Sequence, residues 1–342
     1  MLRYAVIEIT NQCNLRCPHC ASTSGKAREN ELSFEEIDRL LRDIKALGGE
    51  EITIIGGEAL MREDWVDICR RVSELGMRLI LISNGIPMTF DETLSQLGKL
   101  RPHLIGISVD GATRESYKRF RGVDRFDHVI AILRQLREDG HAHVNAITTF
   151  TKANLREFDR FADIFDGTGI TWQVQLANKG GERFDTAQFI TLDDYAYFVE
   201  RMTDTYRRRP TLRLRHMDDF GYYPVDPTLK FLHQTWHGCI AGRQLIGVRS
   251  NGDVMGCLSL GDGFEEANIR EVPLQEIWQS GRYFGRFRNK VRHLTGTCKT
   301  CAFAEECRAG CTGIAVSATG TIGDNPYCIR RMETQFILDG IR

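Results

Sequence analysis

Eleven cysteines are the residues of this chain that point most directly to chemistry. Cys13, Cys17 and Cys20 lie close together, Cys69 stands apart, and seven more lie in the last third of the chain. Residues 1–10 lack the long apolar segment and cleavage site of a signal peptide, so we expect a cytoplasmic protein. Disulfides do not persist in that reducing compartment. Most of the cysteines are therefore expected to bind metal.

The first group has the spacing CxxxCxxC and follows an apolar segment, Tyr4–Thr10, that we expect to be a strand. Three thiolates on one short loop can each bind one iron of a cubane cluster, which leaves the fourth iron open for chemistry. A structural Cys3His zinc site, with His19 as the fourth ligand, is the alternative. The spacing lacks the paired CxxC knuckles of zinc ribbons, and this favours the cluster.

The elements that must position these cysteines alternate between short β-branched segments and amphipathic helical segments up to about residue 180. The predicted strands are Tyr4–Thr10, Ile52–Ile55, Arg78–Ser83, Leu104–Val109, Val144–Thr149 and Ile170–Leu176. Six βα units are fewer than the eight of a closed barrel. We therefore predict an α/β fold, a partial (β/α)6 TIM-like barrel, with its chemistry at the carboxyl ends of the strands.

Glycine-rich or polar motifs follow the second, third and fourth predicted strands. They are Gly56-Gly57-Glu58, Ser83-Asn84-Gly85 and Ser108-Val109-Asp110-Gly111. Each motif by itself predicts only a turn, but three such motifs in order at successive strand ends are more specific. Together with CxxxCxxC, they resemble the radical S-adenosylmethionine (SAM) superfamily.

The resemblance implies that Cys13, Cys17 and Cys20 bind a [4Fe-4S] cluster whose open iron is chelated by SAM. It also implies a set of SAM contacts in which Glu58 accepts hydrogen bonds from the methionine amine. That set is Gly56, Gly57, Glu58, Ser83, Asn84, Ser108 and Asp110. An external one-electron donor of the flavodoxin or ferredoxin type would reduce the cluster, and SAM would be cleaved to a 5′-deoxyadenosyl radical.

The C-terminal cysteines resemble those of the SPASM domain, which carries auxiliary iron–sulfur clusters. The resemblance implies two auxiliary clusters here, expected to be of the [4Fe-4S] type. By resemblance, the distal cluster takes Cys298, Cys301, Cys307 and Cys328. The proximal cluster takes Cys239, Cys257 and Cys311, and its fourth ligand stays open between His233, His237, another residue and an open iron. Two structural zinc sites are the alternative for this region.

These patterns divide the chain into a barrel (1–185), a connecting, substrate-facing segment (186–235), a cluster domain (236–328) and a C-terminal tail (329–342). The connecting segment holds polar candidates for proton transfer, each of which could instead belong to a solvated loop. They are His216, Asp218, Asp219 and Tyr222. Candidates for substrate contact near the sixth strand are Gln173, Gln175, Lys179 and Arg183. Cys69 lies on a helical apolar stripe and is expected to be a core residue.

The composition excludes some classes of partner. The chain has 45 Lys and Arg against 46 Asp and Glu, so its formal charge of −1 disfavours nucleic acid. No apolar segment approaches the roughly twenty residues of a membrane-spanning helix. The resemblance favours oxidation of a ribosomally made peptide, by cross-linking or dehydrogenation. The alternatives are a carbohydrate substrate such as an aminoglycoside, and an iron–sulfur electron carrier or metal sensor without SAM chemistry.

Overall fold

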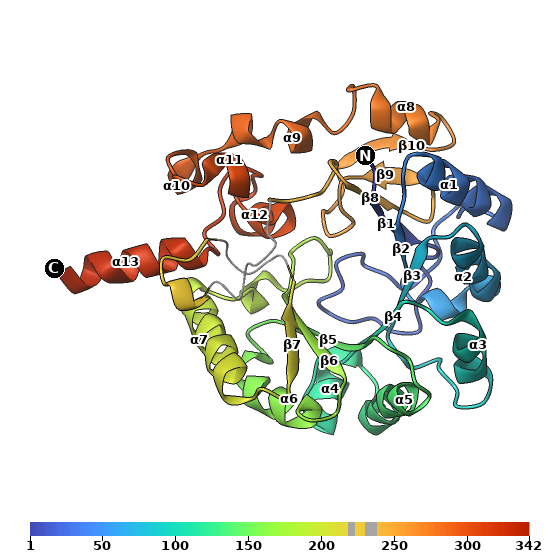
Figure 1. The fold of residues 1–342 in the computed structure, drawn as a ribbon, viewed down its shortest axis with the longest axis horizontal. Coiled ribbons are helices and arrows are strands. Elements are labelled where there is room, and N and C mark those ends of the chain that lie inside the picture. The colour runs from blue at the N-terminus through green and yellow to red at the C-terminus, as the bar shows by residue number, and fades with distance from the viewer. Residues whose placement is uncertain (218–222, 230–237, 342) are drawn as a thin grey trace.

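The computed structural model describes residues 1–217, 223–229 and 238–341 (Figure 1). Its strands are β1 (Tyr4–Glu8), β2 (Glu51–Ile55), β3 (Arg78–Ser83), β4 (Leu104–Ser108), β5 (Val144–Phe150), β6 (Thr171–Leu176), β7 (Arg213–His216), β8 (Leu245–Val248), β9 (Asp253–Met255) and β10 (Glu265–Asn268). They form one sheet in the order β10-β9-β8-β1-β2-β3-β4-β5-β6-β7. Neighbours from β8 through β1 to β7 are parallel, whereas β8, β9 and β10 pair antiparallel.

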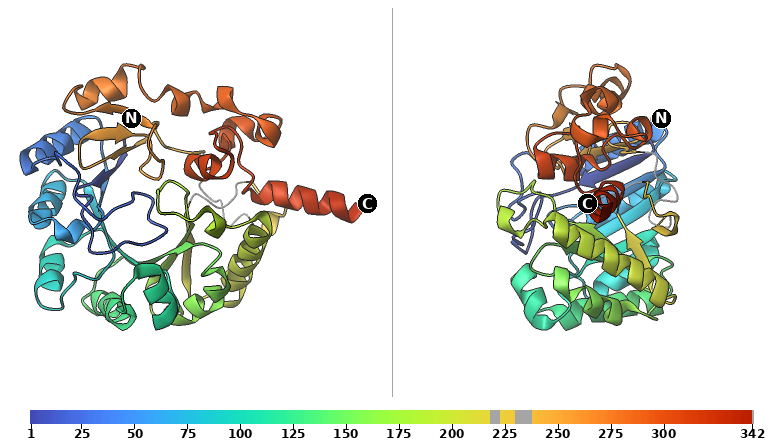
Figure 2. Two further views of the ribbon diagram at one scale, coloured as in Figure 1. Left: turned by 180° about the vertical axis from the view of Figure 1, so that it is seen from behind. Right: turned by 90° about the vertical axis from the view of Figure 1, so that its left-hand side faces the viewer.

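Helices cover the outer face of the curved sheet. The helices of the barrel part are α1 (Phe34–Ala46), α2 (Trp65–Glu74), α3 (Glu92–Leu100), α4 (Arg114–Arg121), α5 (Phe126–Glu138), α6 (Phe158–Phe165) and α7 (Leu192–Arg208). Those of the C-terminal part are α8 (Leu274–Gln279), α9 (Gly285–Arg288), α10 (Gly296–Lys299), α11 (Ala304–Cys307), α12 (Thr312–Thr319) and α13 (Ile329–Ile341). Figure 2 shows α13 extending away from the rest of the molecule.

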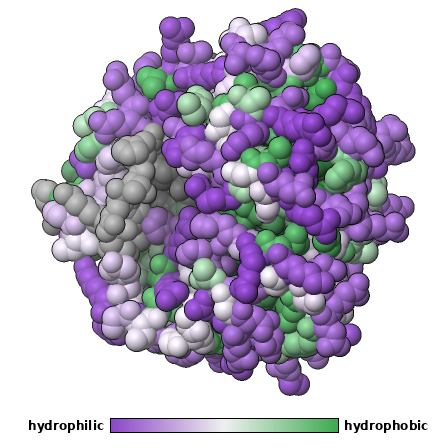
Figure 3. Space-filling model, turned by 45° about the vertical axis from the view of Figure 1, so that its right-hand side comes forward, coloured by the Kyte–Doolittle hydropathy of each residue, from purple (hydrophilic) through white to green (hydrophobic). Residues whose placement is uncertain are grey.

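The core lies between the sheet and these helices. Trp172 of β6 is fully buried, and its ring packs against Phe158 and Phe161 of α6. Its indole nitrogen donates a hydrogen bond to Thr148 Oγ1 at 2.9 Å, which satisfies the one polar group that this side chain buries. Cys69 of α2 is also fully buried, as its position on an apolar stripe predicts. The visible surface in Figure 3 is mainly hydrophilic, with apolar residues in small groups.

All six predicted strands are present, and the partial barrel is confirmed. The sheet is longer than the sequence predicts, because β7 adds to β6 and β8 adds to β1. Both strands have only four residues, too few for a clear periodic pattern. They pair with backbone groups that would otherwise be exposed at the edges of the sheet. One sheet therefore contains strands from the barrel, connecting and cluster segments. None of the described helices combines the length and the hydropathy needed to cross a membrane.

Candidate functional site

The loop after β1 brings Cys13, Cys17 and Cys20 to one cavity of about 270 Å³. The remaining wall of this cavity comes mainly from the ends of the parallel strands. Its lining includes Gly56, Gly57, Ser83, Asn84, Ser108, Arg121, Thr149, Gln175 and Asn178. Five of the seven predicted SAM contacts therefore lie around the same space as the three cysteines.

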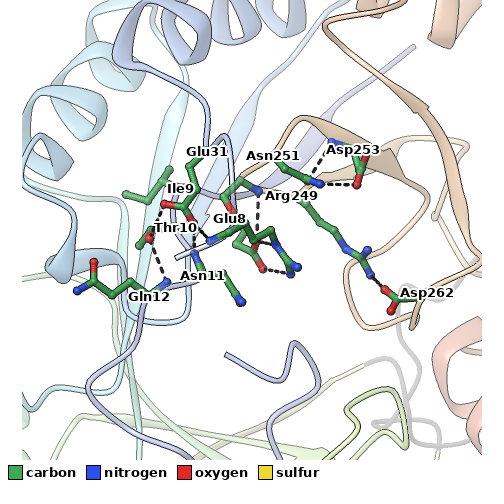
Figure 4. A network of polar contacts seen from close by, with 12 residues as sticks. Glu8, Ile9, Thr10, Asn11, Gln12, Glu31, Arg249, Asn251, Asp253 and Asp262 are labelled. Atoms are coloured by element: carbon green, nitrogen blue, oxygen red, sulfur yellow. Dashed lines mark hydrogen bonds and ion pairs between the residues drawn. The ribbon is translucent and has the colours of Figure 1, made fainter. Parts of the chain in front are cut away.

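Two carboxylates fix the start of the cysteine loop (Figure 4). Glu31 accepts hydrogen bonds from Thr10 Oγ1 at 2.8 Å and from Asn11 N at 2.7 Å. Glu8 is 2% exposed and accepts a hydrogen bond from Ser250 Oγ at 2.9 Å, just after β8. Because Ser250 belongs to the C-terminal part, the cluster loop is anchored to both parts of the chain.

Gly56 and Gly57 let the loop after β2 lie against the backbone of the cysteine loop. Gly57 N donates to Thr10 O at 2.7 Å, and Glu58 N donates to Gln12 O at 2.8 Å. A Cβ atom on Gly57 would lie 2.4 Å from Gln12 O, and one on Gly56 would lie 2.7 Å from Thr10 O. Only glycine permits so close an approach of two backbones.

Glu58 is 1% exposed and does not line the cavity. Its carboxylate accepts hydrogen bonds from Ser83 Oγ at 2.8 Å and from Asn84 N at 2.7 Å. Burial raises the pKa of Glu58, although these hydrogen bonds oppose the effect. Asn84 Nδ2 in turn lies 3.8 Å from Cys13 Sγ, to which it donates. Glu58 therefore positions two residues that do line the cavity.

Asp110 is the other predicted SAM contact that does not line the cavity. It is fully buried, and its Oδ2 atom lies 2.5 Å from Arg121 Nη2 and 2.8 Å from His19 Nε2. Burial opposes its negative charge, but Arg121 and His19 outweigh burial and hold the pKa of Asp110 below its ordinary value. Arg121 also donates to Cys17 Sγ at 3.5 Å.

Arg121 is a site residue that the sequence does not single out. It occupies the last turn of α4, and a cation is common there because it interacts favourably with the helix dipole. Neither the residue type nor its position in the sequence therefore predicts that Arg121 belongs to the site. Only the fold places it beside Cys17.

The remaining sequence candidates lie partly at the cavity, partly away from it and partly outside the described residues. Gln175 lines the cavity and donates to Thr149 Oγ1 at 3.0 Å, whereas Gln173 and Lys179 do not line it. Arg183 Nη2 donates to Ser24 O at 2.8 Å, at the end of the cysteine loop. His216 ends β7 and contacts Met217 O through Nδ1 at 2.9 Å, away from the cavity lining. Asp218, Asp219 and Tyr222 lie outside the described residues.

The cavity residues fit a cubane cluster held by three thiolates. Cys13 Sγ accepts a hydrogen bond from Leu15 N at 3.4 Å, and Cys17 Sγ accepts the one from Arg121. Hydrogen bonds to sulfur help to set the potential of iron–sulfur sites. In the described part of the chain, no three Cys, His, Asp or Glu side chains converge as they would around a single metal ion. A cubane cluster requires a different arrangement of its ligands, because each thiolate binds a different iron atom.

The seven C-terminal cysteines lie in loops and short helices of the C-terminal part. Burial raises the pKa of Cys298 to about 11 and that of Cys307 to about 12, and the nearby Cys328 adds to both shifts. These three thiols of the predicted distal set are therefore close enough to interact. In the predicted proximal set, Cys239 Sγ accepts a hydrogen bond from Thr312 Oγ1 at 3.2 Å. His233 and His237 are not among the described residues.

Two family models match the chain. That of the radical SAM superfamily matches residues 7–165, and that of SPASM, an iron–sulfur cluster-binding domain, matches residues 239–302. The chain is 29% identical to the AdoMet-dependent heme synthase of Methanosarcina barkeri over 341 residues, which cover 95% of each protein. It is 25% identical to the mycofactocin maturase MftC of Mycobacterium tuberculosis over 334 residues, which cover 94% of this chain and 82% of the maturase.

A solved structure has the same fold. Streptococcus suis SuiB bound to S-adenosylmethionine superposes with a TM-score of 0.75 at 19% identity, over 96% of this chain and 77% of SuiB. The first matched domain implies a [4Fe-4S] cluster that binds SAM, and the second implies auxiliary iron–sulfur clusters. The chain is therefore an enzyme of the radical SAM superfamily with a C-terminal SPASM domain.

Proposed function

We propose that this enzyme oxidises a ribosomally made peptide, by forming a cross-link or by dehydrogenation. The observation that carries the proposal is the single cavity shared by Cys13, Cys17, Cys20 and the strand-end residues. Two comparisons support a peptide as the substrate. MftC is named a maturase, and SuiB has been crystallised with its precursor peptide SuiA.

Each part of the cavity has a role in this proposal. Cys13, Cys17 and Cys20 hold the [4Fe-4S] cluster, whose reaction with SAM supplies a 5′-deoxyadenosyl radical when both are bound. Residues that line the cavity contact SAM: Gly56, Gly57, Ser83, Asn84 and Ser108. Glu58 and Asp110 act through their neighbours. Glu58 fixes Ser83 and Asn84, and Asp110 holds the side chains of Arg121 and His19.

The C-terminal part has a separate role. Cys298, Cys301, Cys307 and Cys328 hold one auxiliary cluster, and Cys239, Cys257 and Cys311 hold the other. If the radical takes one hydrogen atom and a second hydrogen leaves as a proton to solvent, loss of two hydrogens from the substrate leaves one electron to be removed. Clusters held by these cysteines would provide an acceptor for that electron, and an external carrier of the flavodoxin or ferredoxin type would supply the electron that starts the reaction. In this proposal the barrel is formed by residues 1–185 and the substrate-facing connection by residues 186–235. The cluster domain is formed by residues 236–328 and the tail by residues 329–342.

A porphyrin is the second candidate substrate. The relative from M. barkeri is named a heme synthase, and its match to this chain covers 95% of both proteins. The same radical chemistry would then act on a side chain of the porphyrin instead of a peptide residue. The two candidates require the same cluster and SAM residues, so only substrate binding separates them.

Anaerobic turnover assays test the proposal. The enzyme is incubated with SAM, a one-electron reductant and one candidate at a time: peptides encoded beside its gene, an iron porphyrin, or aminoglycoside sugars. We expect 5′-deoxyadenosine to form in response to a peptide, and mass spectrometry to show that the peptide has lost two hydrogens. Formation of 5′-deoxyadenosine only with the porphyrin or a sugar would overturn the assignment of a peptide substrate.

A further inference from the structure

A lysine is buried among the cysteines of the C-terminal part. Lys290 lies in a short 3-10 helix, Lys290–His293, and is 1% exposed. Its ammonium donates to Gly310 O at 3.1 Å and to Thr312 Oγ1 at 2.9 Å. The Thr312 hydroxyl donates in turn to Cys239 Sγ at 3.2 Å. A short hydrogen-bonded chain therefore connects a buried ammonium to a proposed cluster ligand.

The negative groups around Lys290 come from both proposed ligand sets. Burial lowers the pKa of Lys290, and the charges of four nearby cysteines oppose this effect. Two of them, Cys239 and Cys311, belong to the proximal set, and the other two, Cys307 and Cys298, belong to the distal set. Because iron-bound cysteines are thiolates, loading the clusters adds negative charge and favours the ammonium form.

The neighbours that hydrogen-bond to the ammonium are uncharged. Gly310 and Thr312 satisfy two of its protons, and no ion pair between described residues includes Lys290. A buried charge is costly unless an opposite charge compensates it. In the described part of the chain, the thiolates of the two auxiliary sites supply that compensation.

We propose that Lys290 is a positioning residue that raises the reduction potential of the auxiliary clusters. This inference rests on the cluster assignment in the proposed function. One-electron reduction makes a cluster more negative by one charge, while Lys290 keeps its proton. The nearby ammonium stabilises the reduced state, and because the ammonium is buried, solvent screens the interaction less than it would at the surface. Net charge and hydrogen bonding to sulfur are among the features that set iron–sulfur potentials.

The test compares Lys290→Met and Lys290→Gln with a matched surface variant, Lys299→Met. Met removes the charge at similar length, and Gln removes the charge but keeps a donor. Lys299 lies next to Cys298 in sequence but is exposed, so water screens its charge. Anaerobic redox titrations followed by electron paramagnetic resonance give the midpoint potential of each cluster. The SAM-binding cluster serves as an internal reference.

Both Lys290 variants are expected to lower the equilibrium constant for reduction of at least one auxiliary cluster about tenfold, which is about 59 mV for one electron. Lys299→Met and the reference cluster should show no such shift. Unchanged auxiliary potentials in Lys290→Gln, or an equal shift in Lys299→Met, would overturn the inference. So would a folded Lys290 variant that loads no auxiliary cluster, since Lys290 would then be needed for assembly instead.

If neither Lys290 variant folds, Thr312→Val provides the test. It removes the hydroxyl between the ammonium and Cys239 Sγ and leaves Lys290 in place. The potential of one auxiliary cluster should then fall, and an unchanged potential would overturn the inference.

Measurement of iron and acid-labile sulfide in the wild-type enzyme distinguishes a failure of the proposed cluster assignment from a failure of the role of Lys290. Absence of auxiliary clusters there refutes the ligand assignment, whereas clusters with unaltered potentials refute only the role of Lys290.

Discussion

Arg121 and Cys17 are 104 positions apart in the sequence, yet the guanidinium donates a hydrogen bond to the cysteine sulfur at 3.5 Å. The same guanidinium pairs with Asp110, which is fully buried. A proposed cluster ligand and a buried carboxylate thus share one cation. This arrangement makes Arg121 important to stability as well as to the site.

Arg121→Met should lower the free energy of unfolding by about 3–5 kcal/mol, because it leaves the buried Asp110 without its main partner. Arg119→Met on the same helix is the control. Arg119 is 58% exposed and its ion pair with Glu115 spans 3.7 Å, so its loss should cost less than about 0.5 kcal/mol. Urea denaturation under anaerobic conditions measures both. Similar losses in the two variants would contradict the prediction.

Cys17→Ala should abolish reductive cleavage of SAM while the auxiliary sites keep their iron, because the two kinds of site use different cysteines.

Cys301→Ala should lower iron content and product formation while SAM is still cleaved. The control is Cys69→Ala, since Cys69 lies in the core away from both groups and should affect neither readout. Cleavage of SAM at the wild-type rate by Cys17→Ala would refute the first site, and unchanged iron in Cys301→Ala would refute the second.

Gly57→Ala should sharply reduce SAM cleavage, because the new Cβ would lie 2.4 Å from Gln12 O and displace the cysteine loop. Gly98→Ala in α3 is the matched control, since a Cβ there meets nothing within 4 Å. In a helix interior that change should stabilise the protein by about 0.5–1 kcal/mol. The rate of 5′-deoxyadenosine formation and the cluster absorbance report the outcome. Equal activity in both variants would show that the close approach of the two loops is unimportant.

Burial raises the pKa of the Cys69 thiol from 9.0 to about 12 in the folded chain. Below pH 9 both the folded and the unfolded chain hold this proton, so its contribution to stability is complete. Between pH 9 and pH 12 the unfolded chain loses the proton first, and the contribution falls as pH rises.

Within that window the unfolded chain holds one proton fewer than the folded chain. The free energy of unfolding should therefore fall by about 1.4 kcal/mol per pH unit because of Cys69. Cys69→Ala lacks the thiol, so its free energy of unfolding should fall less steeply with pH than that of the wild type. Chemical denaturation at a series of pH values measures both slopes. Parallel slopes would mean that Cys69 ionises equally easily in the two states.

The sequence by itself indicated which cysteines are candidate iron ligands and where the six strands β1 to β6 lie. Cys13, Cys17 and Cys20 are separated by so few residues that one loop must carry them all. Most of the segments that became β1 to β6 are apolar on both faces, which is what parallel strands covered by helices require. Local spacing was sufficient here because these features depend on neighbouring residues.

Only the tertiary structure decided which distant groups surround those residues. The positions of Arg121 beside Cys17, of Glu58 behind Ser83 and Asn84, and of Lys290 among the C-terminal cysteines all depend on packing between separate segments. A buried cation and a surface cation look the same in a sequence. Their difference arises from desolvation, which exists only after the chain has folded.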